Sequence, residues 1–213
     1  MRPRQGLRAA LAIVLVVAAG TAGMLAGSAR EGPARAAPGL RADLLPQDLD
    51  GAAAPRIRLR DATGRLVDSA RLRGRPFLVA FVYTHCIDVC PLIGSEIADA
   101  FDRLGGAAPG AAALAVSVDP RGDTPATARR WLAKHGLPRE TRYLVGTRAE
   151  LTPVWRDWFV VPRDGTLADP RAHDASVWLV DARGRLRGRW SGAEGIDPAD
   201  VAHDVRALIA EGH

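Results

Sequence analysis

An apolar run from Phe77 to Tyr83 limits the folds open to this chain more than any other segment. It follows Pro76 and contains no charged residue, which is the pattern of a central strand buried on both faces. A second such run covers 113–118 and ends at Asp119. Strands of this kind lie in sheets that are covered by helices, so the sequence predicts a layered α/β architecture.

Helical patterns alternate with these strands. Pro91 suits the first turn of a helix that Gly105 ends, and Thr124 before Pro125 suits the start of a helix that Gly136 ends. This order predicts a thioredoxin-like sandwich, a central β-sheet flanked by helices with a hairpin at its N-terminal side. The other expected elements are that hairpin (57–67), a short strand (142–145), a helix (149–160), a strand (174–181), a hairpin strand (186–190) and a terminal helix (198–211).

The only two cysteines, Cys86 and Cys90, stand where the first apolar run gives way to the helix of Pro91. A helix beginning near Cys86 would place both side chains on one face, with Cα atoms about 6 Å apart along the axis. Two thiolates in this arrangement can bind one soft metal ion or close into a disulfide. The pair is therefore the predicted functional site, and a plain structural disulfide or two buried thiols is the alternative.

A histidine is the expected third ligand, since two thiolates and one imidazole form a compact site that suits Cu(I). His173 is the candidate because it stands at the start of the predicted strand over 174–181, in a loop that can lie against the cysteine turn. A hydrogen-bonded surface histidine is the alternative interpretation. His85 adjoins Cys86 and is expected to support the site or to be structural. No motif surrounds His135, His203 or His213.

Composition excludes several classes of function. The net charge is +5, but the arginines are scattered among acids, so nucleic-acid binding is disfavoured. A moderately basic face would favour an acidic protein partner. A structural zinc site is disfavoured because such sites use four ligands in closely spaced pairs, and no second pair exists. Two cysteines are also too few for a disulfide-stapled scaffold.

The N-terminal segment has the pattern of an export signal. Arginines precede an apolar stretch, so we expect a signal anchor or signal peptide over 1–27, with the uncleaved anchor favoured. No cysteine follows this stretch, which argues against a lipoprotein anchor. A linker rich in Ala, Pro, Gly and Arg is expected over 28–55, and one domain over 56–213. These features predict a single-pass protein of the inner membrane with its domain on the periplasmic side.

Three motifs carry a family resemblance. They are Tyr83–Pro91, Ser117–Pro125, and His173 ahead of Ser176–Asp181. In these motifs the chain resembles the Sco/SenC family, membrane-anchored copper chaperones for cytochrome c oxidase assembly, over about residues 50–211. Many relatives have proline where this chain has Ile87, a change that affects the rigidity of the turn and removes no ligand.

The resemblance implies a site and a set of partners. Cys86, Cys90 and His173 are expected to bind copper, as Cu(I) or alternatively Cu(II), and Asp119 to lie beside the site and tune it through hydrogen bonds. The expected function is delivery of copper to the copper A site of cytochrome c oxidase subunit II. An upstream copper donor and a thiol reductant are the other implied partners.

Other functions use the same residues. One is a thiol–disulfide oxidoreductase that reduces the cysteines of the partner's copper site, with Cys86 as the attacking thiolate and Cys90 as the resolving thiol. A redox or copper sensor needs the same ligands as a chaperone. A thiol peroxidase is more distant, because the chain lacks a convincing peroxidatic Thr-to-Cys spacing. We therefore expect primarily a metallochaperone, with oxidoreductase activity as the alternative.

Overall fold

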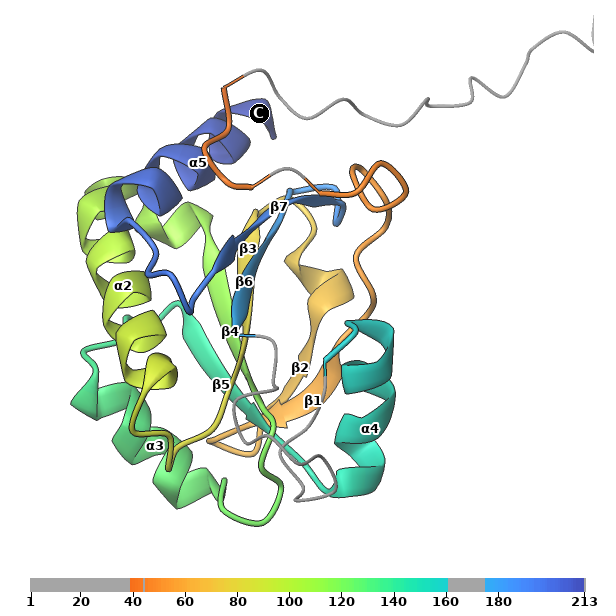
Figure 1. Cartoon of the computed structure of the whole chain (residues 1–213), viewed down its shortest axis with the longest axis vertical. Helices are drawn as coiled ribbons and strands as arrows, with labels where there is room; N and C mark the ends of the chain where they lie inside the picture. The colour runs from red at the N-terminus through yellow and green to blue at the C-terminus, as the bar shows by residue number, and fades with distance from the viewer. Residues whose placement is uncertain (1–38, 44, 161–174, 213) are drawn as a thin grey trace, which may run out of the picture. The chain divides into compact units, whose positions relative to one another are not determined.

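Seven strands form one mixed sheet in the computed structural model, which describes residues 39–43, 45–160 and 175–212. Their order is β2-β1-β5-β4-β3-β6-β7 (Figure 1). The central strand β3 (Phe77–Val82) pairs in parallel with β4 (Ala112–Ser117) and antiparallel with β6 (Ser176–Val180). The other strands are β1 (Arg58–Asp61), β2 (Leu66–Asp68), β5 (Thr141–Val145) and β7 (Leu186–Ser191).

Helices cover both sides of this sheet. Figure 1 shows α2, α3 and α5 on one side of the strands and α4 on the other. This arrangement confirms the predicted layers, although two short 3-10 helices, η1 and η2, had no clear signal in the sequence. The bounds are η1 (Ser69–Leu72), α2 (Val89–Leu104), η2 (Gly105–Gly110), α3 (Pro125–Lys134), α4 (Arg148–Asp157) and α5 (Pro198–Glu211).

The start of α2 differs from the starts of the other three α-helices among the described residues. In α3, α4 and α5 a polar side chain accepts a hydrogen bond from the first turn, namely that of Thr124, Thr147 or Asp197. At the start of α2, Asp88 makes no such side-chain bond. The Cys86 sulfur instead accepts a hydrogen bond from the Cys90 N–H at 3.3 Å. A side chain of the predicted site therefore also stabilises the first turn of its helix.

Aromatic side chains fill the space between the sheet and α4. Phe81 of β3 is fully buried, and its ring centroid lies 5.9 Å from that of Trp158. The Trp155 indole donates a hydrogen bond to the Ser117 carbonyl at 2.9 Å. These contacts join α4 to the carboxyl ends of β3 and β4, the edge of the sheet that carries the cysteines.

Part of the expected linker packs against the domain. The backbone N–H groups of Arg41 and Ala42 donate to the buried carboxylate of Asp204 in α5 at 2.8–3.0 Å. Isolated bridges also join Asp43 to Arg189 and Ala53 to Arg185. The described residues of this stretch are thus held by edge strand β7 and by α5.

No helix among the described ranges is long and apolar enough to cross a membrane. The expected anchor over residues 1–27 lies outside those ranges, so the anchor stays a prediction.

We predict that Phe81→Ala lowers the free energy of unfolding by about 3–5 kcal/mol, because it removes a buried ring and leaves a cavity in the centre of the sheet. The matched control is Phe159→Ala. Phe159 is 68 % exposed, and its truncation should change the free energy of unfolding by less than about 0.5 kcal/mol. Urea denaturation of both variants measures the difference. Equal losses would show that the Phe81 ring is not part of the core.

Candidate metal centre

The two cysteines come together across a turn, and this corrects one expectation. α2 begins at Val89, so Cys86 lies in the turn that follows β3 and only Cys90 lies in the helix. The turn is closed by the Cys86 N–H, which donates to the Tyr83 carbonyl at 3.3 Å. The predicted approach of the two thiols is confirmed, but the turn produces it rather than one helix face. Both are unlinked thiols, Cys90 fully buried and Cys86 only 7 % exposed.

The surroundings of the two sulfurs give them opposite acidities. The hydrogen bond from Cys90 is the main cause that lowers the pKa of Cys86 to about 5, and the Asp88 and Cys90 backbone groups act in the same direction. The pKa of Cys90 is raised far above its usual range by that same hydrogen bond, by burial and by the negative charges of Cys86 and Asp123. At neutral pH the pair therefore holds one thiolate, at Cys86, and one proton, at Cys90.

The predicted supporting residue Asp119 lies in the turn that follows β4. Its carboxylate accepts hydrogen bonds from the N–H groups of Arg121 (3.2 Å) and Gly122 (3.0 Å), so it folds back on its own turn. A Cβ atom on Gly122 would lie 2.4 Å from the Asp119 carboxylate and 2.8 Å from the His85 ring. A side chain at this position would therefore have to push the Asp119 and His85 side chains aside.

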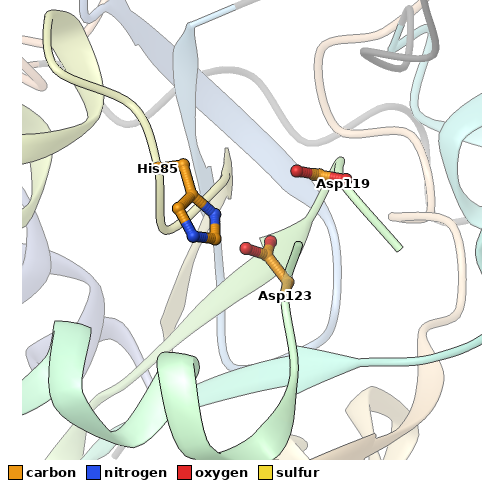
Figure 2. Close-up of side chains that lie close together, drawn as sticks. All are labelled: His85, Asp119 and Asp123. Atoms are coloured by element: carbon orange, nitrogen blue, oxygen red, sulfur yellow. The ribbon is translucent and has the colours of Figure 1, made fainter. Parts of the chain in front are cut away.

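A third polar side chain joins His85 and Asp119. Figure 2 shows Asp123 beside them, and each of the three has a possible metal-ligating atom within 4.8 Å of those of the other two. Asp123 is only 4 % exposed. Its carboxylate accepts three hydrogen bonds, from the Thr84 N–H (2.8 Å), the Ser117 hydroxyl (2.6 Å) and the Tyr143 hydroxyl (2.8 Å). Both oxygens therefore already have protein donors.

The sequence alone predicted no role for Asp123 or Tyr143. Asp123 stands inside the motif over 117–125, which was a signal, but the donors to its carboxylate come from distant parts of the chain. Tyr143 lies in β5, and burial together with the charge of Asp123 raises the pKa of its hydroxyl well above the usual value. A buried tyrosine beside a buried carboxylate could be recognised only once β5 was placed next to β4.

The described histidines other than His85 have other partners. His135 packs against Trp131, with ring centroids 4.8 Å apart, and His203 makes a 2.8 Å contact with Asp204. His173 and His213 lie outside the described residues. Within the described ranges, no histidine or carboxylate lies close enough to both cysteine sulfurs to complete a three-ligand metal site with them. A three-ligand site that contains both sulfurs would take its third ligand from elsewhere in the chain.

We predict that the metal-free, reduced protein is alkylated at Cys86 with a rate that rises through pH about 5 and is level above pH about 6.5, because the thiolate is the reactive form. Cys90→Ala should move this rise towards the ordinary thiol pKa near 8.5, since it removes the main hydrogen bond to the thiolate. Cys90→Ser keeps a donor and should move it less. Peptide mass spectrometry gives the rates, and a wild-type midpoint near pH 8.5 would contradict the assignment.

Comparison with known proteins gives a consistent family. A sequence model of the SCO1/SenC family matches residues 48–210. The SCO1 protein homolog of Bacillus subtilis is 23 % identical over 147 residues, 68 % of this chain and 76 % of that protein. The SCO2-like protein RC0895 of Rickettsia conorii is 26 % identical over 134 residues, and the match spans 61 % of this chain and 64 % of that relative.

Solved structures show the same fold. Copper-bound ScoI of Bradyrhizobium japonicum superimposes with a TM-score of 0.64 at 31 % identity, covering 74 % of this chain and 99 % of that one. BsSco, described as having a disulfide switch, gives a TM-score of 0.63 at 22 % identity over 74 % and 93 % of the two chains. These likenesses confirm the predicted Sco-type, thioredoxin-like fold. Since the family match spans most of the sequence, the chain belongs to the SCO1/SenC family.

Proposed function

We propose that this protein is a copper chaperone that binds copper through Cys86, Cys90 and His173. The observation that carries the proposal is the meeting of two sulfurs at the start of α2, one of them ionised at neutral pH. Thiolates are the ligand type that selects Cu(I). A relative that is 31 % identical, ScoI of Bradyrhizobium japonicum, has been solved with copper bound.

Copper binding at this pair would release a proton. Cys90 holds a proton in the metal-free protein because Cys86, burial and Asp123 all oppose its ionisation. A metal bound to both sulfurs replaces that proton, so the affinity for Cu(I) should rise with pH. A disulfide between the same sulfurs would exclude the metal. The redox state of the pair thereby decides whether the protein can carry copper, and an external thiol reductant must keep it reduced.

Delivery would proceed by ligand exchange. Thiolates of the accepting protein replace the chaperone's ligands one at a time, so the ion is never released into water. We propose cytochrome c oxidase subunit II, at its copper A site, as the acceptor, since BsSco is described as a member of a family of cytochrome c oxidase assembly proteins. Residues 1–27 would anchor the domain on the periplasmic side of the inner membrane, where an upstream donor supplies the copper.

The surface beside the cysteine turn leaves room for such an acceptor. A hollow of about 650 Å³ lies next to the turn, between Thr84 and His85 and the exposed face of α3. Arg130 and Lys134 line it, and among the described residues no acidic side chain does. An acceptor with an acidic surface would complement this hollow and approach the copper ligands from the same side.

A thiol–disulfide oxidoreductase is the second candidate, favoured by the low pKa of Cys86 and the protonated Cys90 beside it. The Cys86 thiolate would attack a partner disulfide, forming a mixed disulfide and releasing one partner thiolate. Cys90, on losing its proton, would then attack the Cys86 sulfur, which releases the second partner thiolate and leaves a Cys86–Cys90 disulfide. An external thiol returns the pair to its reduced form.

We predict that the reduced wild-type protein binds one equivalent of Cu(I) and that the Cys86→Ser/Cys90→Ser double variant binds none at the same free copper concentration. Titration in the presence of a competing Cu(I) chelator measures both. Wild-type protein oxidised to the disulfide is the matched control and should also fail to bind. Equal stoichiometry in all three samples would exclude the cysteine pair as the copper site.

We also predict that His173→Ala separates the two candidate functions. Loss of the imidazole should weaken Cu(I) binding at least tenfold and remove the nitrogen scatterer from the X-ray absorption spectrum of the copper-loaded protein. Turnover of a model disulfide by the metal-free variant should stay within twofold of wild type, because the two sulfurs are unchanged. Unaltered copper binding would remove His173 from the ligand set.

A further inference from the structure

Asp123 is a buried carboxylate that neither proposed reaction uses. It is 4 % exposed, and no arginine, lysine or histidine of the described residues forms an ion pair with it. Burial of a lone carboxylate is costly unless several hydrogen bonds compensate it. Three short ones do, from Thr84, Ser117 and Tyr143. A carboxylate buried with this many donors next to the cysteine turn calls for a specific role.

The three donors belong to three neighbouring strands. Thr84 follows β3, Ser117 ends β4, and Tyr143 lies in β5; these strands are adjacent in the sheet. Ser117 also accepts a hydrogen bond from the Asp119 N–H at 3.1 Å. Through that hydroxyl the Asp123 carboxylate holds the Asp119 turn as well as the cysteine turn. One side chain thus sets the position of both turns relative to each other.

Direct metal binding does not explain Asp123 in this arrangement. One carboxylate oxygen accepts from two hydroxyls, and the other accepts from the Thr84 N–H. A metal ion at the oxygen that accepts from both hydroxyls would have to displace one of them and leave a buried polar group without a partner. Asp119 and His85 face each other over Gly122, at the outer side of the cluster.

The contact with Thr84 bears on the cysteines. Thr84 stands two residues before Cys86, in the short connection between β3 and α2. Its N–H donates a hydrogen bond to the Asp123 carboxylate at 2.8 Å. Two further hydrogen bonds hold the turn: the Cys86 N–H donates to the Tyr83 carbonyl, and the Cys90 N–H donates to the Cys86 sulfur. Loss of the Thr84 bond would remove a hydrogen bond that joins this turn to the segment after β4.

We propose that Asp123 is the positioning residue of the copper site: its carboxylate holds the Thr84 backbone so that the Cys86 sulfur lies against the first turn of α2. The inference rests on the proposed function for its consequence in copper binding, but its structural part can be measured without metal. What matters is an acceptor oxygen aimed at the Thr84 N–H. An amide oxygen supplies that acceptor too.

Three variants test this. Asp123→Ala removes the acceptor, Asp123→Asn keeps an acceptor oxygen without the charge, and Tyr143→Phe removes one donor while leaving the Thr84 contact intact. In metal-free, reduced protein, Asp123→Ala should speed amide hydrogen exchange at least tenfold at both Thr84 and Cys90. The Cys90 N–H is the critical reporter, because its acceptor is the Cys86 sulfur. Asp123→Asn and Tyr143→Phe should leave both rates within threefold of wild type.

Copper binding is the second readout. Asp123→Ala should weaken Cu(I) affinity at least tenfold, with Asp123→Asn and Tyr143→Phe again within threefold of wild type. If exchange at Cys90 is unchanged in Asp123→Ala, or if Tyr143→Phe alters both readouts as much as Asp123→Ala does, the positioning role is refuted. If wild-type protein binds no copper, the proposed function fails, and the exchange rates still decide the role of Asp123.

Discussion

The parallel pairing of β3 with β4 is the contact on which the site depends. Val82 lies opposite Ser117, so the turns that follow the two strands leave the same edge of the sheet side by side. Cys86 lies in one of these turns and Cys90 in the helix that follows it, while Asp119 and Asp123 follow the other strand. Both strands are buried throughout, so core packing fixes their register. That register in turn fixes the positions of the two turns that carry the site.

Local patterns in the sequence predicted much of the fold. Pro91 and Pro125 indicated helix starts, Gly105 and Gly136 helix ends, and the uninterrupted apolar runs indicated buried strands; each of these signals acts within a few residues. Pro91 does lie in the first turn of α2, but a start near Cys86 was three residues too early, because the Cys86 sulfur caps the helix in place of a residue such as serine or threonine. That cap became recognisable only with the turn in place.

Long-range contacts were beyond such reasoning. Asp123 accepts from residues 39 positions earlier and 20 positions later, and Asp204 holds a backbone 162 to 163 positions away. The spacing of apolar and polar residues along the sequence does not predict contacts between residues this far apart. The cysteine pair was predictable because its four-residue spacing is local. Its partition into one thiolate and one thiol depends on donors and burial that come from the folded turn, so that property required the structure.

The attachment of residues 41–54 has a mechanical consequence. Hydrogen bonds to Asp204 and bridges to Arg185 and Arg189 hold this stretch, while the cysteine turn follows the end of β3. A pull transmitted from the preceding chain would be borne first by helix α5 and an outer strand. The load would thus enter the domain at β7 and α5 rather than at the cysteine turn that follows β3.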